Sequence, residues 1–305
     1  MGLMSANLAS AANVTIVAAG AGDSRFFQTS DGTKLHFLYR GPTDPGVVPR
    51  PVLVFVPGWS MPAAIWEPQL AHFSKTHRVV AFDPRSQGRS DLATGSHAPE
   101  RRALDLAELL DHLSVRADPA GYVLAGWSLG VLECLTFLTN HGDRGLKGLI
   151  LVDNSIGEDP PPVARKSDFL KHLRDPQKRP AAVEGFVRSM FKTPREEAYL
   201  RAITDAALRI NALASVQLLS QPFPRTYWRE AVYRVEQPVY YIVTPKFAGQ
   251  AGNLKARHPT ARISIFDGAG HALFVDEAAR FNTLVAAFLR EAVEVPSSAP
   301  RRAQP

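Results

Sequence analysis

The feature that most constrains how this chain folds is the alternation of short apolar segments with segments of helical periodicity. A strand that is apolar at nearly every position is typical of a sheet that is covered on both faces. The apolar segments are 51–56, 78–83, 122–126, 146–153, 238–243 and 261–267. The helical patterns among them are 100–113, 129–140 and 276–292. This alternation predicts a mainly parallel sheet with helices on both faces.

Two further segments near the N-terminus alternate apolar and polar residues, RFFQT at 25–29 and KLHFLYR at 34–40. The dipeptide Asp31-Gly32 between them is a turn signal, so the two segments predict an antiparallel hairpin. Together with the six buried strands, the hairpin gives an α/β fold with a mostly parallel eight-stranded sheet.

The alternation stops between Asp153 and Val239, where the sequence has helical patterns and no strand pattern. Proline clusters flank this stretch, at 160–162 and at 222–224. A helical insertion between two strands predicts a cap over the strand ends. We therefore expect a core of residues 25–153 and 236–292, and a helical cap of residues 154–235. We expect residues 1–24 to form a flexible leader and residues 293–305 a disordered tail.

Composition narrows the class of protein. With 45% hydrophobic and 21% charged residues, the chain is typical of a soluble globular protein. The net charge of +6 comes without a basic motif interleaved with aromatic residues, which disfavours a nucleic-acid partner. No run of 18 apolar residues predicts a membrane span. We expect a cytoplasmic location, with export left open because residues 1–22 resemble a degenerate signal peptide. The oligomeric state is not indicated.

The tripeptide Gly-Trp-Ser occurs at 58–60 and again at 126–128. Ser128 lies between the apolar strand 122–126 and the helical pattern 129–140, and glycines stand two residues before and after it. Glycines at these positions permit a sharp turn that exposes the serine, while the following helix N-terminus favours negative charge. This context predicts a nucleophile at Ser128. The alternative is an ordinary serine that caps the helix.

Four motifs in order, VPGWS, FDPRSQGRSD, GWSLG and GAGHALFVDE, resemble the α/β-hydrolase superfamily over about residues 25 to 292. The resemblance implies that two backbone N–H groups, from Trp59 and Leu129, form an oxyanion hole. Relatives usually carry His-Gly before the first donor, whereas this chain has Pro57-Gly58. Ser60 then lies on the oxyanion side of the site, where we expect it to contact substrate.

The resemblance also implies that His271 is the general base. Most relatives place the triad acid beyond the seventh strand, but the stretch YYIVTPKFAGQAGNL contains no Asp or Glu. A second arrangement in the superfamily puts the acid at the end of the sixth strand, where this chain has Asp153. We expect Asp153 to be the acid. The alternatives are Asp267, Glu158 and Asp159.

A Ser-His-Asp triad performs acyl transfer without a metal or an organic cofactor. The expected activity is hydrolysis of a carboxylic ester or lactone through an acyl-enzyme. Aromatic residues of the cap, among them Phe186, Tyr199 and Trp228, suit a small apolar or aromatic substrate, although they could equally pack the cap onto the sheet. The alternatives are C–C bond hydrolysis, perhydrolysis, and a small-molecule binding protein with a residual hydrolase site.

Overall fold

The computed structural model describes residues 23–43, 50–158 and 168–294. Its eight strands form one sheet in the order β1-β2-β4-β3-β5-β6-β7-β8. The strands are β1 (Ser24–Gln28), β2 (Lys34–Arg40), β3 (Val52–Val56), β4 (Val79–Asp83), β5 (Tyr122–Trp127), β6 (Leu146–Val152), β7 (Val239–Val243) and β8 (Arg262–Ile265). Pairing is antiparallel from β1 to β2 and from β2 to β4, and parallel elsewhere. The predicted fold class is confirmed.

Strand burial follows from the apolar segments. Every residue of β3, β4, β5 and β7 is buried, as expected for strands covered on both faces. The last strand, β8, lies at the sheet edge and is only partly covered. The predicted leader and tail lie almost wholly outside the described residues.

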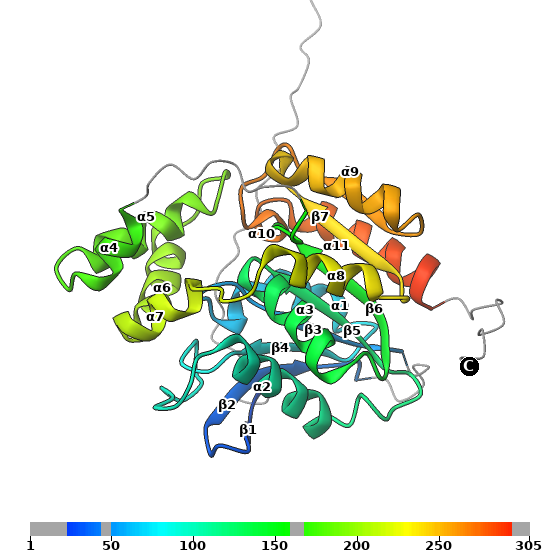
Figure 1. Cartoon of the computed structure of the whole chain (residues 1–305), viewed down its shortest axis with the longest axis horizontal. Helices are drawn as coiled ribbons and strands as arrows, with labels where there is room; N and C mark the ends of the chain where they lie inside the picture. The colour runs from blue at the N-terminus through cyan, green and yellow to red at the C-terminus, as the bar shows by residue number, and fades with distance from the viewer. Residues whose placement is uncertain (1–22, 44–49, 159–167, 295–305) are drawn as a thin grey trace, which may run out of the picture.

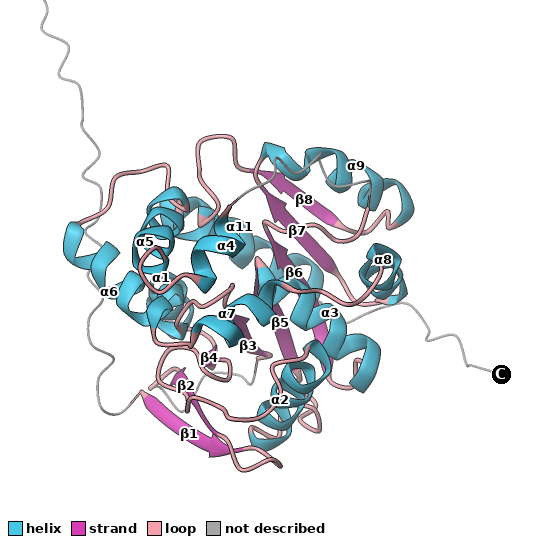
Figure 2. Ribbon diagram, turned by 60° about the vertical axis from the view of Figure 1, so that its left-hand side comes forward, coloured by secondary structure: helices cyan, strands magenta, loops and turns pink. Residues whose placement is uncertain are grey.

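Helices cover both faces of the sheet (Figure 2). On one face, α1 (Glu67–Phe73) and α11 (Ala278–Phe288) share a hydrophobic cluster with the sheet. On the other, the cluster is formed with four helices. These are α2 (Pro99–His112), α3 (Leu129–His141), α8 (Arg225–Arg234) and α9 (Ala248–Arg257). Shorter helices are η1 (Ala63–Trp66), η2 (Pro245–Phe247), α10 (Leu273–Asp276) and η3 (Leu289–Val293).

Four helices lie together outside these two layers, grouped on one side of the molecule (Figure 1). They are α4 (Phe169–Arg174), α5 (Arg179–Ser189), α6 (Glu197–Leu208) and α7 (Ala212–Leu219). The predicted cap range also included α8, but α8 packs against α3, and its buried Trp228 belongs to the cluster on that face of the sheet. We therefore propose that the cap consists of α4 to α7.

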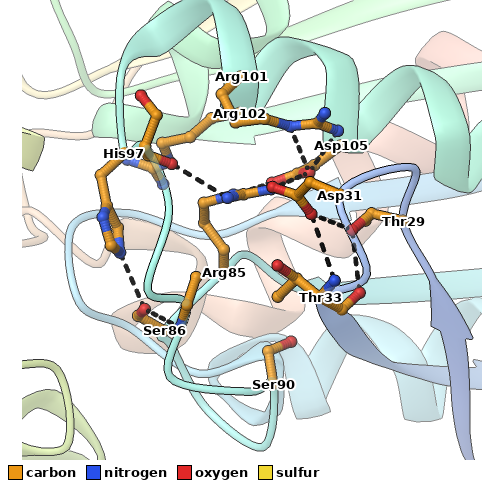
Figure 3. Close-up of polar contacts among 12 residues, drawn as sticks. Thr29, Asp31, Thr33, Arg85, Ser86, Ser90, His97, Arg101, Arg102 and Asp105 are labelled. Carbon is orange, nitrogen blue, oxygen red and sulfur yellow. Dashed lines mark hydrogen bonds and ion pairs between the residues drawn. The ribbon is translucent and has the colours of Figure 1, made fainter.

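The loop that follows β4 is held by a buried ionic network (Figure 3). Arg85 is fully buried and donates two hydrogen bonds to Asp105, at 2.6 and 2.7 Å. It also donates to Asp31 at 3.0 Å. These contacts fix the loop to α2 and to the β1–β2 turn.

His97 makes a pH-sensitive contact with Ser86 of the same loop. Its Nε2 lies 2.9 Å from Ser86 Oγ, and burial together with the charges of Arg102 and Arg85 lowers its pKa from 6.5 to about 4. Between these values the unfolded chain binds a proton that the folded protein does not, so stability falls as the pH falls from 6.5 to about 4. We expect urea denaturation to show a smaller loss over this range for His97→Asn than for the wild type. An equal loss would contradict the assignment.

Candidate active site

Ser128 occupies a strained turn between β5 and α3. Its φ is 54° and its ψ is −123°, a conformation that non-glycine residues rarely adopt. Two hydrogen bonds hold the turn to β6 and to the segment that follows it: Ser128 N donates to Val152 O at 2.9 Å, and Asn154 Nδ2 donates to Ser128 O at 2.7 Å. The sheet therefore fixes the backbone that presents the Ser128 hydroxyl.

The two glycines that flank Ser128 are required by close backbone contacts. A Cβ on Gly126 would lie 2.4 Å from the carbonyl oxygen of Gly130. A Cβ on Gly130 would lie 2.4 Å from the carbonyl oxygen of Val56 in β3. Helix α3 thus begins in direct contact with the two central strands, which leaves no room for a side chain.

We expect Gly130→Ala to destabilise the protein by about 1–3 kcal/mol, because the added methyl group must displace backbone. The matched control is Gly185→Ala in α5, where an added Cβ meets no atom within 4 Å. Alanine there is expected to raise stability by up to about 1 kcal/mol through its helix propensity. Urea denaturation of both variants measures the contrast. A Gly130→Ala variant as stable as the wild type would show that the turn is not closely packed.

His271 lies on the loop between β8 and α10, directly opposite the turn. Its Nε2 is 2.9 Å from Ser128 Oγ, and its Nδ1 is 2.7 Å from Asp153 Oδ2. The carbonyl oxygen of His271 accepts a hydrogen bond from Trp127 Nε1 at 2.9 Å. The residue before Ser128 therefore anchors the loop that carries the imidazole.

Asp153 follows the last residue of β6 and has a positive φ of 45°. Its side chain is buried, and its Oδ1 accepts hydrogen bonds from the N–H of Thr244 at 2.7 Å and from the Thr244 hydroxyl at 2.8 Å. With Oδ2 facing His271, both carboxylate oxygens have partners. Thr244 follows the neighbouring strand β7, so strand pairing orients the Asp153 carboxylate.

The other candidate acids lie elsewhere or outside the described residues. The Glu158 carboxylate accepts hydrogen bonds from Tyr233 at 2.6 Å and from Asn253 at 3.2 Å. Asp267 accepts a hydrogen bond from Lys192 through its backbone carbonyl. Asp159 lies outside the described residues. Among the carboxylates of Asp153, Glu158 and Asp267, it is that of Asp153 that lies against His271.

The VPGWS turn lies against Ser128. A Cβ on Gly58 would be 3.0 Å from Ser128 Cβ, so glycine lets the turn approach this closely. Within the described part of the chain, no group accepts a hydrogen bond from Trp59 N–H. Leu129 is the first residue of α3, where an N–H has no partner within its own helix. Both N–H groups therefore belong to segments that adjoin Ser128.

The VPGWS turn contacts the cap through the Trp59 side chain and the β4 loop through the backbone of Ser60. Trp59 Nε1 donates to the carbonyl oxygen of Ser215 at 2.7 Å, and the indole ring packs edge-on against Phe169 and Phe186. Ser60 N donates to Gln87 Oε1 at 2.6 Å. Ser60 Oγ is buried and has no hydrogen-bond partner among the described residues.

Some of the supporting residues were not predicted from the sequence. Asn154, Thr244 and Gln87 hold the turn, the carboxylate and the VPGWS segment, respectively. Each of the three bonds to a residue of another segment, and the two segments are neighbours only because of the order of the strands in the sheet. Asn154 had a sequence signal, since it directly follows the predicted acid.

Over residues 23–43, 50–158 and 168–294, no three His, Cys, Asp or Glu side chains gather in a way that could hold a metal ion. Over the same ranges, no helix has the length and apolar character needed to cross a bilayer.

A model of the alpha/beta hydrolase family matches residues 53–284, which is most of the chain. The chain belongs to the alpha/beta hydrolase family. Among solved structures, an esterase from a Rhodococcus species superposes with a TM-score of 0.74 and 21% identity, over 88% of this chain and 99% of that one. This likeness shows the alpha/beta hydrolase fold.

Two curated proteins resemble this alpha/beta hydrolase in sequence. A pimeloyl-[acyl-carrier protein] methyl ester esterase from Aromatoleum aromaticum is 30% identical over 251 residues, 74% of this chain and 93% of that protein. A non-heme chloroperoxidase from Streptomyces lividans is 36% identical over 141 residues, 46% of each chain. The chain thus spans less than half the length of the chloroperoxidase.

Proposed function

We propose that this alpha/beta hydrolase cleaves a carboxylic ester or lactone through an acyl-enzyme on Ser128. The observation that carries the proposal is the continuous chain of contacts from Ser128 Oγ through both nitrogens of His271 to the Asp153 carboxylate. A carboxylate at Nδ1 keeps the proton on that nitrogen and leaves Nε2 free to accept one. This is the arrangement that activates a serine hydroxyl.

In the proposed reaction, Ser128 Oγ attacks the ester carbonyl carbon while His271 Nε2 takes the hydroxyl proton. The carbonyl oxygen becomes an oxyanion that accepts hydrogen bonds from the N–H groups of Trp59 and Leu129. Loss of one such donor typically costs around 3 kcal/mol of transition-state stabilisation. His271 then gives its proton to the leaving alcohol. Water hydrolyses the acyl-serine in the reverse sequence, and the acid is released.

The proposed substrate is a small apolar or aromatic ester. The rings of Phe169 and Phe186 from the cap lie within 6 Å of the Trp59 ring, next to the proposed oxyanion donor. Of the aromatic residues considered for this pocket, Trp228 lies on the α3 face of the sheet and Tyr199 packs against Phe191. The preference for an apolar substrate is therefore supported by Trp59, Phe169 and Phe186, and not by Trp228 or Tyr199.

Hydrolysis of a panel of 4-nitrophenyl esters and simple lactones tests the proposal. We expect turnover of esters with short to medium acyl chains or an aryl acyl group. Phe186→Ala is expected to lower kcat/KM for the aryl ester more than for the acetate, because truncation removes apolar contact area. Absence of turnover on the whole panel, together with tight binding of an ester, would favour a binding protein instead.

Perhydrolysis is a second candidate, favoured by similarity to a bifunctional esterase/perhydrolase from Acinetobacter calcoaceticus, which is 29% identical over 128 residues, 42% of this chain and 43% of that one. In that reaction hydrogen peroxide replaces water as the acceptor of the acyl group from Ser128. Peracid formation in the presence of a carboxylic acid and peroxide would identify it. Both reactions need the same acyl-enzyme, so a Ser128→Ala variant should lack both.

A further inference from the structure

A second Ser-His-Asp chain lies outside the site described above. Ser24 Oγ is 2.8 Å from His36 Nε2, and His36 Nδ1 is 2.6 Å from Asp83 Oδ2. The atoms and their order are the same as in the chain from Ser128 to Asp153. Each of the two distances differs from its counterpart by 0.1 Å.

Three neighbouring strands assemble this second chain. Ser24 begins β1 at the edge of the sheet, and His36 lies in β2, directly opposite Asp83 of β4 in the register. His36 and Asp83 are almost fully buried, whereas Ser24 is partly exposed. The base and the acid are therefore shielded from water, while the residue that carries the proposed nucleophile is partly exposed.

Asp83 fixes the protonation pattern of His36. Its Oδ1 accepts a hydrogen bond from Ala63 N, and its Oδ2 accepts one from Arg89 N at 2.8 Å as well as facing His36 Nδ1. A carboxylate at Nδ1 holds the proton there, so Nε2 is the acceptor for the Ser24 hydroxyl.

An arginine completes the arrangement around Ser24. Arg89 Nη1 donates to Ser24 Oγ at 2.8 Å, so the serine proton points to His36. A guanidinium at this distance can also stabilise the oxyanion that forms when Ser24 attacks a carbonyl group. Arg89 is exposed, so solvent weakens this effect.

We propose that Ser24 is a second nucleophile, which accepts an acyl group from an activated ester and keeps it. Ser24 Oγ attacks the carbonyl carbon, His36 Nε2 takes the proton, and the leaving alcohol carries that proton away. The product is an acyl ester on Ser24. Ser24 lies in an extended strand, so it lacks the helix N-terminus that follows Ser128, and deacylation is expected to be slow.

This inference rests on the contacts of Ser24 and not on the activity of Ser128. The test therefore uses the Ser128→Ala variant, treated with 4-nitrophenyl acetate and analysed by peptide mass spectrometry. Ser30 is the matched internal control. Like Ser24, it accepts a hydrogen bond from an arginine, Arg101, at 3.2 Å, but its hydroxyl donates to the Glu108 carboxylate where that of Ser24 faces an imidazole.

We expect Ser24 to be acetylated about 100-fold faster than Ser30, the lower end of what a positioned base contributes. His36→Asn keeps an amide donor for Asp83 but removes Nε2, and it should reduce Ser24 acetylation to the rate of Ser30. Acetylation of the two serines at equal rates in Ser128→Ala would overturn the proposal, whether or not the His36 variant folds. Unchanged Ser24 acetylation in a folded His36→Asn variant would overturn it as well. Ser24→Ala should leave ester turnover by the wild-type Ser128 unchanged.

Discussion

Replacing Ser128 with alanine is expected to lower kcat for a chromogenic ester by about 10⁶, which is the loss seen when a triad nucleophile is removed. The reason is that no acyl-enzyme can form at the turn, and only stabilisation by backbone donors remains. Initial rates with 4-nitrophenyl acetate measure the effect. The small acetylation of Ser24 proposed above is separable, because it gives at most one equivalent of nitrophenol.

Ser60 provides the matched control, since it stands in the other Gly-Trp-Ser tripeptide. Ser60→Ala is expected to retain most of the activity, because among the described residues its hydroxyl makes no hydrogen bond, whereas His271 Nε2 lies against Ser128 Oγ. A fluorophosphonate probe should label Ser128 first and most rapidly. Loss of activity in Ser60→Ala with full activity in Ser128→Ala would reverse the assignment of the nucleophile.

The second large effect is expected for Asp153→Asn, at about 10⁴ in rate, as for the equivalent change in a serine protease. Thr244 donates twice to Oδ1, so the asparagine oxygen is expected to face Thr244 and its NH₂ group to face His271. His271 Nδ1 must then accept a hydrogen bond, which moves the ring proton to Nε2. In that tautomer the imidazole cannot take the proton from Ser128.

Asp267→Asn is the control for this prediction, because Asp267 contacts Lys192 through its backbone carbonyl, which the substitution leaves in place. We expect near wild-type rates for that variant. Circular dichroism and thermal melting of both variants separate loss of fold from loss of chemistry. Equal rate losses in the two variants, or full activity of folded Asp153→Asn, would exclude Asp153 as the acid.

The strands could be predicted from the sequence because burial on both faces leaves a nearly continuous apolar segment. Helices α1 and α9 could not be predicted, because α1 is short and α9 contains two glycines. Helix α9 contains two glycines in AGQAGNLKAR and is held by the burial of Ala251 and Leu254 against the sheet. Helix α1 has only seven residues and begins with Glu67-Pro68. Both segments are helical because tertiary packing buries one of their faces.

The cap boundary shows a different limit of sequence analysis. Helix α8 follows the proline cluster at 222–224 and has the same apolar periodicity as the cap helices. Periodicity tells which face is buried but not which partner covers it. The structure assigns Trp228 to the α3 face of the sheet. The support of the candidate acid could not be predicted for the same reason. Thr244 reaches Asp153 only because β7 lies beside β6 in the sheet.

The register between β5 and β6 has a consequence for how such a site can change over time. Trp127 and Val152 are partners in the parallel ladder, and Ser128 and Asp153 are the residues that follow them. Hydrogen bonds between two adjacent strands, about 4.8 Å apart, therefore set the spacing of the proposed nucleophile and acid. With Asp153 as the proposed acid, the segment after Thr244, which carries Lys246, does not have to supply a carboxylate. Pro245 and Lys246 are exposed, so substitutions at these two positions can change the surface while the chemistry of the site is preserved, whereas Phe247 is held in the core.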